Sequence, residues 1–527
     1  MEFDYVVVGG GSSGCVVAGR LSEDPACRVA LLEAGGNDTS PFIHVPAGMI
    51  ATVPTHYLNW ALATVPQANL NGRCGYQPRG RVLGGSSSIN AMIYTRGHSA
   101  DYDAWNCPGW GWQDVLPWFK HAENNERGAD EFHGVGGPLN VADLKSPNPV
   151  ARLFVQAAVA EGFHACRDFN AAGQEGVGFY QVTQKDGQRM SAAKAYLTRH
   201  LGRPNLAVLT RARASRILFE GRRAVGVEFH RAGRVERMRA RREIIVSAGA
   251  FHSPQLLLLS GIGSAAELQR FGIAVVHDLP EVGRNLQDHL DLVLLHASPS
   301  PDLVALSLGG AVRTACALAE YWRFRRGQLT TNYAEAGGFI KSDAAQAIPD
   351  LQLHFTVAFV DDHSRRLHYG AGMSLHVCQL RPHSRGTVTL ESIDPFASPR
   401  IDPNYLSVPA DMEALVKGFH IARRIMDNPI LDAVRGRNLY PLDEPSDENV
   451  RADIRRRADT IYHPVGTCRM GSDKTAVVDP VLRVRGVLGL RVADASIMPN
   501  LIGGNTNAPC VMIGERAADF IRSGQAS

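Results

Sequence analysis

The glycine-rich segment at the start of the chain limits its fold more than any other feature. Residues 3–8 form a short run of mostly β-branched and aromatic side chains, and residues 9–14 follow with the pattern Gly-x-Gly-x-x-Gly. A second apolar run over residues 28–32 ends at Glu33 and Ala34. A strand, a glycine turn, a helix and a second strand that ends in an acid are typical of a dinucleotide-binding βαβ unit.

Each residue type in this segment has a physical task. Gly9 permits the tight turn, Gly11 lets the backbone approach a pyrophosphate, and Gly14 lets the helix pack closely on the strand. The N-terminus of the helix, which includes Ser13, presents free N–H groups to the phosphates. The carboxylate of Glu33 accepts hydrogen bonds from the adenosine ribose and repels a 2′-phosphate, which disfavours NADP. This segment by itself does not separate FAD from NAD.

The composition is that of an ordinary globular chain. With 527 residues it exceeds the size that one hydrophobic core serves, so two domains or one domain with a large insertion are expected. A formal net charge of +3 is too small to indicate a nucleic-acid partner. The arginine-rich residues 231–242 alternate with apolar ones, which predicts an exposed hairpin strand instead.

Cysteine usage and hydropathy favour a cytoplasmic location. The nine cysteines show no Cys-x-x-Cys pair and no metal-ligand spacing, which indicates reduced thiols and predicts no metal site. The first strand begins by Phe3, which leaves no room for a signal peptide, and no apolar stretch is long enough to span a membrane. Residues 303–322 are rich in Leu, Ala and Val but include Arg313 and Glu320. This favours a buried helix; the alternative is a peripheral contact with the inner membrane.

Several further blocks follow in a fixed order and resemble the signatures of the glucose-methanol-choline (GMC) oxidoreductases. They lie at residues 79–105, 249–263, 282–289, 381–386, 463–468 and 505–507. With the glycine turn, the resemblance extends from about residue 3 to residue 522. Within the family the blocks look most like those of bacterial FAD-dependent alcohol dehydrogenases, with medium-chain alcohol, choline, sorbose and polyethylene glycol dehydrogenases nearby.

The resemblance implies an α/β fold with two domains. The first is a Rossmann-type FAD-binding domain, discontinuous in sequence, over residues 1–150, 191–294 and 461–527. The second is an α+β substrate-binding domain over residues 151–190 and 295–460, whose antiparallel sheet roofs the flavin.

The resemblance also implies a second set of contacts with FAD. Gly84, Gly85 and Ser86 form another glycine-rich turn, whose amides can approach phosphate or flavin atoms. In the family, Asn90 and Ala91 approach the flavin. Asp494, at the end of an expected strand, corresponds to the residue that binds the ribityl hydroxyls. The remaining predicted contacts are Ala34, Arg81, Ala495 and Ala508. Some members attach the flavin through a histidine in this loop, where Ile89 stands here, so noncovalent FAD is predicted.

Two residues near the C-terminus are predicted to carry the chemistry. His463 precedes Pro464, so it lies on a turn, and it matches the base of the family. Alcohol oxidation needs a base within hydrogen-bond reach of the hydroxyl, and histidine with its usual pKa of about 6.5 is neutral near pH 7 to 8. Asn507, 44 positions later, matches the second active-site residue of the family. It is also a typical N-cap for a helix over residues 508–521, whose N-terminus favours negative charge on the flavin.

The substrate is not fixed by these motifs. Residues 351–355 and 386–390 alternate as strands do and are expected in the substrate sheet. Aromatic residues that could line a pocket for an apolar alcohol, although each one singly is more readily assigned to the core, are Tyr321, Trp322, Phe339, Phe355 and Phe359. Choline would need a carboxylate or an aromatic cage, for which Glu335, Asp361 and Asp362 are available.

The sequence therefore predicts oxidation of a primary alcohol to the aldehyde, by hydride transfer to flavin N5 with His463 as base. Electrons then pass to a quinone or another acceptor. An oxygen-using alcohol oxidase and a choline- or sorbose-type polyol dehydrogenase are the nearest alternatives. An FAD-containing lyase and a light-driven decarboxylase are alternatives of another class. The oligomeric state stays open.

Overall fold

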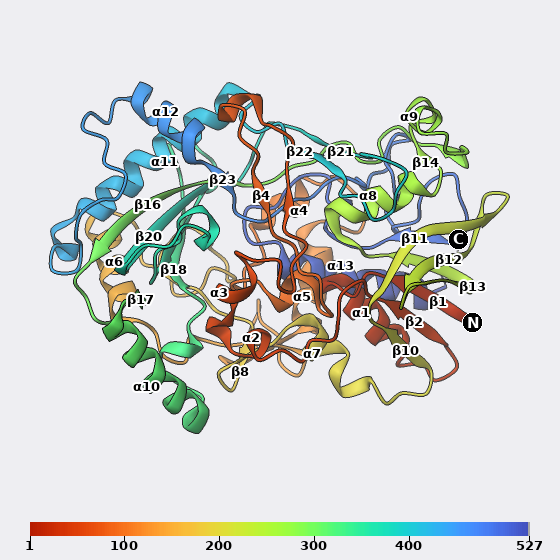
Figure 1. Ribbon diagram of the computed structural model, residues 1–527, viewed down its shortest axis with the longest axis horizontal. Coiled ribbons are helices and arrows are strands. Elements are labelled where there is room, and N and C mark those ends of the chain that lie inside the picture. Colours follow the sequence, from red (N-terminus) through yellow and green to blue (C-terminus); the bar gives the residue numbers. More distant parts are fainter. Residues whose placement is uncertain (525–527) are drawn as a thin grey trace.

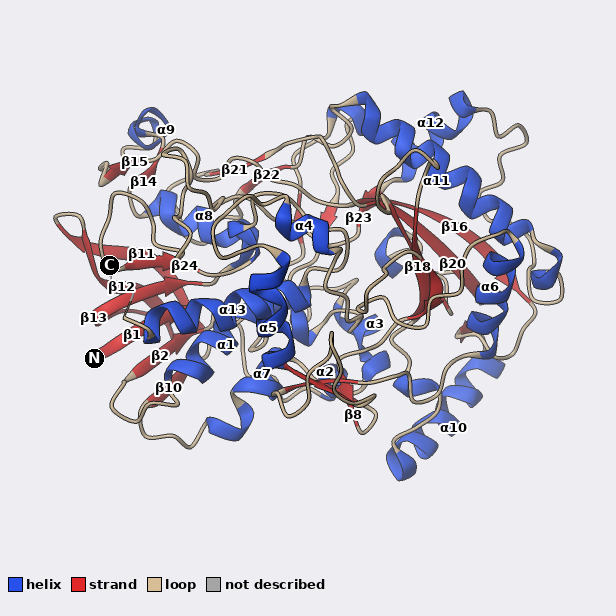
Figure 2. Cartoon of the chain, turned by 180° about the vertical axis from the view of Figure 1, so that it is seen from behind, coloured by secondary structure: helices blue, strands red, loops and turns tan. Residues whose placement is uncertain are grey.

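Two seven-stranded sheets lie toward opposite ends of the long axis of the molecule (Figure 1). The computed structural model describes residues 1–524. Much of the chain between the two sheets is loop, as the view from behind shows (Figure 2).

The sheet near the N-terminus is mostly parallel and contains the predicted dinucleotide-binding unit. Its order is β10-β2-β1-β13-β12-β11, and β24 also pairs with β13. The strands are β1 (Glu2–Val8), β2 (Val29–Leu32), β10 (Leu206–Leu209), β11 (Ala212–Glu220), β12 (Arg223–Arg231), β13 (Arg234–Val246) and β24 (Leu490–Val492). β1 pairs in parallel with β2 and β13, whereas β12 and β13 form the hairpin that was expected around residues 231–242. β2 is buried along its whole length and β1 along nearly all of it, which explains their continuous apolar runs.

Helices cover this sheet and complete the larger hydrophobic core. α1 (Ser12–Leu21) follows the glycine turn and packs against α13 (Asn507–Arg522). α5 (Trp112–Ala122) packs on α13, and α7 (Ala192–Tyr196) packs on α1. α8 (Gly249–Leu259) packs against β11. The two ends of the chain therefore meet on one domain, since α1 and α13 are neighbours.

The second sheet is antiparallel and has its own core. Its order is β23-β16-β20-β19-β18-β7, with β17 beside β20. The strands are β7 (Gly176–Phe179), β16 (Leu290–Ser298), β17 (Ala305–Leu306), β18 (Ala334–Ile340), β19 (Leu351–Thr356), β20 (Gly370–Gln379) and β23 (Asp459–Thr460). Helices α6 (Pro149–Ala160), α11 (Pro409–Asp427) and α12 (Asp447–Arg457) contribute to this core. α10 (Leu308–Phe324) projects from the edge of the domain in both views (Figures 1 and 2).

Shorter elements connect these layers. The helices are α2 (Pro41–His44), α3 (Met49–Thr52), α4 (Ser99–Asp103) and α9 (Ala265–Arg270), with 3₁₀ turns that include η1 (Pro46–Gly48), η3 (Gly85–Ser88), η5 (Gln328–Thr330) and η8 (Ala495–Ile497). Two-stranded pairs are β3 (Leu62–Ala63) with β4 (Tyr76–Gln77), β5 (Glu123–Asn125) with β6 (Leu139–Val141), β8 (Gln184–Lys185) with β9 (Gln188–Arg189), β14 (Ile262–Gly263) with β15 (His277–Asp278), and β21 (Thr387–Thr389) with β22 (Arg400–Asp402).

The predicted fold class is confirmed, with one strand placed elsewhere. Residues 351–355 lie in β19 of the antiparallel sheet, as expected. Residues 386–390 instead supply β21, which pairs with β22 and packs against α8. Val388 is buried with Phe251 of α8 in a small cluster, so the alternating pattern reflects a hairpin that packs on α8.

The predicted aromatic residues divide between core, cavity and surface. Phe339 and Phe355 are fully buried, and Phe355 stacks on Phe154 of α6 with 4.7 Å between ring centroids. Phe359 alone of the set lines the cavity described below. Trp322 is 81% exposed, and most of α10 is exposed with it, so the expectation of a buried helix at residues 303–322 was wrong. Among the helices of residues 1–524, none is long and apolar enough to cross a membrane.

Candidate active site

A cavity of about 750 Å³ runs from the N-terminal glycine turn to the antiparallel sheet. The predicted site residues that line it are Gly9, Gly11, Ser13, Glu33, Ala34, Gly85, Ser86, Asn90, Ala91, His463, Asp494, Ala495 and Asn507. Four further predicted residues, Gly14, Arg81, Gly84 and Ala508, do not line it. The cavity thus joins blocks that are far apart in the sequence.

The first glycine turn leaves room for a ligand on one side only. Gly9 has φ +100°, and a Cβ there would come within 2.7 Å of the Ser247 carbonyl carbon. A Cβ at Gly14 would overlap the Gly9 carbonyl oxygen. At Gly11 the nearest atom to such a Cβ is 3.9 Å away, so this position faces open space. Gly9 and Gly14 are therefore needed for the turn itself, whereas Gly11 is needed only where another molecule approaches.

The second glycine turn lies against the first, and the two together form a cradle at this end of the cavity. Gly84 has φ +92° and Gly85 has φ +54°. A Cβ at Gly85 would lie 2.7 Å from the Cα of Gly11, so the two turns touch through their glycines. η3 begins at Gly85, and Ile89, which follows it, also lines the cavity.

Glu33 closes one end of this cradle. Its carboxylate accepts hydrogen bonds from the backbone N–H of Gly10 at 2.9 Å and of Gly35 at 2.6 Å. Burial raises the pKa of Glu33 to about 7, although the two backbone bonds act in the opposite direction. Nearby, the ring of Trp60 lies 4.5 Å from that of His252, tilted by 37°, and 4.6 Å from the guanidinium of Arg81. Trp60 lines the cavity, whereas Arg81 does not.

Polar atoms without a protein partner mark the cavity as a ligand site. Nε and Nη2 of Arg79, Nε2 of His252 and Oδ1 of Asn332 are buried and have no hydrogen-bond partner among the described residues. All three residues line the cavity. Buried polar groups normally find partners, so these donors and the acceptor fit a large polar cofactor such as a dinucleotide. Sequence reasoning did not single them out, although Arg79 and His252 lie within quoted blocks.

Asp494 ties the end of β24 to the start of α8. Its carboxylate accepts hydrogen bonds from the backbone N–H groups of Gly249 and Ser496, at 2.9 and 2.8 Å, and from the Ser253 hydroxyl at 2.5 Å. Asp494 lines the cavity, so its carboxylate is both fixed and accessible to a ligand.

Strand pairing brings His463 to a second histidine. β16 and β23 are antiparallel, and the backbone N–H of Ile461 donates to the His289 carbonyl at 3.1 Å. The Nδ1 atoms of His289 and His463 are consequently 2.9 Å apart. The His463 backbone N–H also donates to buried Asp288 at 2.9 Å. This support fixes the turn that the proline at 464 predicted.

Hydrogen-bond chemistry determines where the protons of the two rings lie. Nε2 of His289 is 3.0 Å from the Leu380 carbonyl, which only accepts, so this nitrogen carries the hydrogen. Nδ1 of His289 is then an acceptor, and Nδ1 of His463 donates to it. The lone pair of His463 is left on Nε2, which faces the cavity side.

Asn505 is the amide that meets this lone pair. Its Nδ2 lies 3.1 Å from Nε2 of His463. Its Oδ1 accepts from the amide of Gln352 at 3.1 Å and from the Thr95 hydroxyl at 3.3 Å, which fixes the amide with its N–H groups toward His463. Asn507 lines the same cavity as His463, and its Oδ1 accepts from the Ser12 hydroxyl at 2.8 Å.

Two further features of this end of the chain differ from expectation or went unnoticed. The N-cap of α13 is Thr506, without a side-chain capping bond, so Asn507 is the first helical residue and not the cap. His354 of β19 also lines the cavity, and neither of its ring nitrogens has a hydrogen-bond partner among the described residues. Nothing in the spacing along the sequence indicates that His354 would lie on this wall.

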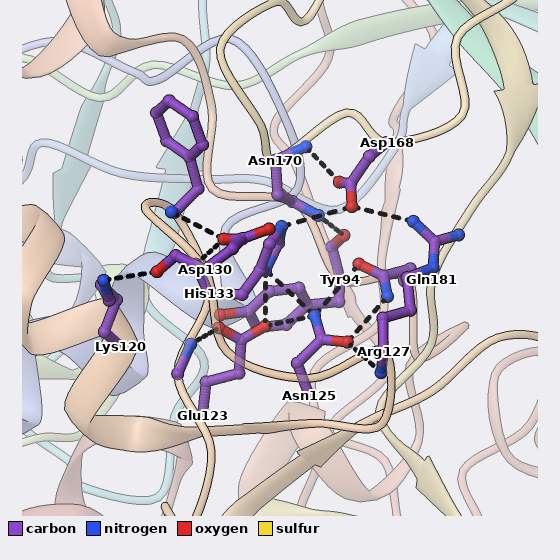
Figure 3. A network of polar contacts seen from close by, with 12 residues as sticks. Tyr94, Lys120, Glu123, Asn125, Arg127, Asp130, His133, Asp168, Asn170 and Gln181 are labelled. Carbon is purple, nitrogen blue, oxygen red and sulfur yellow. Dashed lines mark hydrogen bonds and ion pairs between the residues drawn. The ribbon is translucent and has the colours of Figure 1, made fainter.

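A buried polar network lies beside the segment at residues 94–96 (Figure 3). The side chain of Asn170 donates to the Tyr94 carbonyl at 3.1 Å and accepts from the Arg96 backbone N–H at 3.0 Å. His133 lies between the carboxylates of Glu123 and Asp168, each 3.2 Å away. Burial lowers the pKa of His133, but hydrogen bonds to the two carboxylates outweigh it and raise the pKa to about 9.

Burial keeps the histidines of the site neutral. It holds the pKa of His463 well below the usual value, and the neighbouring His289, His354 and Arg79 lower it further. Burial lowers the pKa of both His289 and His354 to about 3. A neutral His463 with its lone pair on Nε2 can accept a proton.

Comparison with known families agrees with this geometry. Residues 3–291 and 382–514 match the N-terminal and C-terminal models described as GMC oxidoreductase. The chain belongs to the GMC oxidoreductase family.

Named relatives match nearly the whole length of the chain. An alcohol dehydrogenase [acceptor] of Pseudomonas putida is 50% identical over 98% of this chain and 95% of its own length. The mitochondrial choline dehydrogenase of Homo sapiens is 45% identical over 99% of this chain and 90% of its own length. Among solved structures, pyridoxine 4-oxidase from Mesorbium loti has a TM-score of 0.89 at 35% identity, covering 99% of both chains.

Membership of the GMC family gives the cavity its broad function. The chain is an oxidoreductase that acts on a CH–OH group, and the family implies FAD as its cofactor. The glycine cradle and the unpartnered polar atoms of Arg79, His252 and Asn332 fit that cofactor.

Proposed function

We propose that this chain oxidises a neutral primary alcohol to the aldehyde, with His463 as the base and noncovalently bound FAD as the hydride acceptor. Electrons then pass to a quinone or a similar acceptor. The observation that carries the proposal is the chain of hydrogen bonds from Leu380 through His289 to His463. It places the lone pair of a neutral imidazole at the cavity, beside Asn505.

The residues of the site divide the work on the hydroxyl group. The substrate O–H donates to Nε2 of His463, which takes the proton as the hydride leaves the carbon. Nδ2 of Asn505 donates to the alcohol oxygen and stabilises the negative charge that develops there. His289 is a positioning residue, because it holds the His463 ring in the tautomer that leaves Nε2 without a hydrogen. When bound, FAD supplies the two-electron acceptor.

The residues around the cradle support noncovalent binding of FAD. Ile89 stands where some family members carry the linking histidine, and its aliphatic side chain cannot form such a bond. The N-terminus of α13 meets the cavity through Thr506 and Asn507, and free N–H groups there favour an anionic group. Asp494 and Glu33 are retained as acceptors for hydroxyl groups of the cofactor.

The lining of the substrate end favours an apolar alcohol over choline. Of the cavity carboxylates there, Asp362 pairs with Arg365 at 2.7 Å, whereas Asp291, Asp361 and Asp459 contact the histidines His376, His368 and His363 at 2.6, 2.7 and 3.2 Å. Glu335 does not line the cavity; it binds Thr331 and the backbone of Asn148. Apolar groups that line the cavity and suit a hydrocarbon chain include Met49, Ile50, Val53, Tyr333, Ala358 and Phe359.

The name of one relative supports an electron acceptor other than oxygen. The Pseudomonas putida protein is named as an alcohol dehydrogenase that uses an acceptor, which favours a carrier such as a quinone over oxygen. Oxidases of the same fold exist, since the pyridoxine and formate enzymes carry that name. Hydrogen peroxide formed in step with alcohol consumption would therefore overturn the dehydrogenase assignment.

An anaerobic titration of the FAD-loaded protein tests the proposal. Primary alcohols from short aliphatic to medium-chain and benzylic, together with choline, are added while the visible flavin absorbance is followed. Aliphatic primary alcohols are expected to bleach the flavin, and choline is expected to leave it oxidised. Acid precipitation should release the flavin into the supernatant. A flavin that stays oxidised with every alcohol would favour a lyase or a light-driven decarboxylase instead.

The role of His463 is tested by substitution. His463→Gln should retain FAD but lower the rate of flavin reduction about 10²- to 10⁴-fold, the usual contribution of a general base. His56→Gln is the matched control, because His56 is exposed and does not line the cavity. Equal rates in the two variants would remove His463 from the mechanism.

A further inference from the structure

Helix α10 presents an apolar face to solvent. Leu308, Val312 and Trp322 are 84%, 66% and 81% exposed. Positions 308, 312, 315, 319 and 322 follow helical spacing, so with Ala315 and Ala319 they form one stripe. Gly310, Ala317 and Tyr321, on the opposite side, are the buried residues of α10. The helix is therefore apolar on its outward face as well as its inward face, whereas a surface helix usually turns polar side chains outward.

Neighbouring side chains enlarge this stripe. Leu318 on the same helix is 56% exposed. β17 pairs with the start of β20, with Leu306 opposite Gly370. Tyr369, which is 79% exposed, therefore lies beside the start of α10, next to Leu306, which is 54% exposed. Single exposed apolar residues are common, but a continuous patch of this kind marks an interaction surface.

Basic side chains gather at the C-terminal end of the patch. The helix and the turn after it contain four arginines and one glutamate: Arg313, Arg323, Arg325, Arg326 and Glu320. Arg326 pairs with Glu320 at 3.0 Å, and the guanidinium of Arg325 lies 5.9 Å from the centre of the Trp322 ring. An exposed tryptophan beside arginines, at the end of an apolar stripe, is typical of helices that lie in the interface of an anionic membrane.

We propose that α10 docks this enzyme on the surface of a bilayer that contains anionic phospholipid. The apolar stripe enters the boundary between headgroups and acyl chains, and Arg323, Arg325 and Arg326 contact lipid phosphates. The helix lies in the plane of the surface and does not span it. A second copy of this chain is a poorer occupant of the patch, because two α10 faces would bring arginines of like charge together.

Packing connects the C-terminal end of α10 to the cavity wall. Leu329 of η5 and Met49 of α3 pack on the same small cluster, which contains Ala47, Tyr333 and Ala358. η5 contacts both α10 and η1. Met49 and Ile50 line the cavity, and Ile50 is 45% exposed. Docking through α10 thus holds this part of the cavity wall near the lipid surface, which suits an alcohol or an acceptor that dissolves in lipid.

Vesicle sedimentation of the FAD-loaded full chain tests docking. Protein is mixed with vesicles of phosphatidylcholine alone or of phosphatidylcholine with phosphatidylglycerol, and the bound fraction is measured after centrifugation. The native chain is expected to sediment with the anionic vesicles and to be released by salt. A native chain that stays in the supernatant with both kinds of vesicle would overturn the proposal.

Matched variants distinguish binding through the patch from nonspecific adsorption to vesicles. Leu308→Ser with Trp322→Ser should weaken binding at least tenfold, whereas Leu201→Ser should bind as the native chain does; Leu201 is 51% exposed but lies away from α10. Arg323→Gln with Arg325→Gln should weaken binding to anionic vesicles about 25-fold, at roughly fivefold per charge. The matched control is Arg231→Gln with Arg234→Gln, in the β12–β13 hairpin. Equal loss in patch and control variants would contradict the assignment.

Two further measurements distinguish the remaining outcomes. Sedimentation velocity reports the oligomeric state, and a native dimer that Leu308→Ser with Trp322→Ser dissociates would replace the bilayer by a second copy as the occupant. Flavin reduction by an alcohol in free solution should be the same in the native chain and all docking variants. Failure of docking is thereby separated from failure of the proposed reaction.

Discussion

Changing Asn505 to aspartate should disable His463 without removing it. Nδ2 of Asn505 lies 3.1 Å from Nε2 of His463, so Asn505→Asp places a carboxylate oxygen at the same distance. Gln352 and Thr95 donate to the other oxygen, which favours the ionised form. The new anion stabilises the protonated imidazolium, and a protonated His463 cannot accept the alcohol proton.

The magnitude follows from charge pairing in a buried site. In the native chain, burial and the neighbouring His289, His354 and Arg79 keep the pKa of His463 well below its usual value. An opposite charge at this distance raises a pKa by about one to three units, which corresponds to about 1.4 to 4 kcal/mol. Below the new pKa the rate of flavin reduction should fall about tenfold per pH unit.

The assay is the anaerobic rate of flavin bleaching by a saturating alcohol, measured by stopped flow across a range of pH. The acidic limb of the profile should move upward by about one to three pH units in Asn505→Asp. Asn449→Asp is the matched control, because Asn449 of α12 is exposed and does not line the cavity, and its acidic limb should stay where the native chain has it. A limb that stays in Asn505→Asp, or that moves equally in Asn449→Asp, would refute the reasoning.

Two further predictions use other parts of the structure. Gly11→Ala should fold with the native melting temperature when free of FAD but fail to retain FAD, because its Cβ meets open space where a ligand approaches; Gly14→Ala should lose the fold itself, because its Cβ overlaps the Gly9 carbonyl. Flavin absorbance per protein and thermal melting measure both, and FAD retention by Gly11→Ala would contradict the placement of the cofactor. The pKa of His133 is raised to about 9, so its pairing stabilises the fold fully below about pH 6.5, and this stabilisation is lost as the pH rises through about 9. In denaturant unfolding, the free energy of unfolding of the native chain should therefore exceed that of His133→Gln by about 3 kcal/mol near pH 6. This difference should disappear by about pH 9.5, and a difference that is independent of pH would contradict the prediction.

Local geometry is the part of the site that the sequence predicts well. The task assigned to Gly14 depends on the Gly9 carbonyl five positions earlier, and Gly9 has the positive φ that the turn requires, so both follow from the local glycine pattern. The close approach of Ser247 to Gly9 involves a distant segment and could not be predicted in this way. The strand before the glycine turn and the turn at His463 follow from similar local rules. Arg79 and His252 could not be selected in this way, because their unpartnered nitrogens become visible only when distant segments enclose the cavity.

Sequence patterns whose outcome depends on a packing partner predicted the structure less well. Residues 386–390 alternate as a strand of the large sheet would, but alternation does not identify the neighbouring strand, and β21 pairs with β22. The apolar residues of α10 were expected in a core because apolar composition alone does not distinguish a buried face from one exposed for a partner. Asn505 was not singled out, because spacing along the Asn-Thr-Asn turn does not show that its amide contacts His463.

The direction of the Asn505 amide is set by the substrate sheet as much as by the helix it precedes. Asn505 leads into α13 of the cofactor domain, yet Gln352 of β19 holds its oxygen. His463 follows β23, which pairs with β16 of the same sheet, and its ring is held by His289 just before β16. Both partners of the 3.1 Å contact are therefore oriented by the antiparallel sheet. A shift of that sheet relative to α13 would separate the base from the amide. In the proposed mechanism, the antiparallel sheet therefore orients both side chains that act on the alcohol.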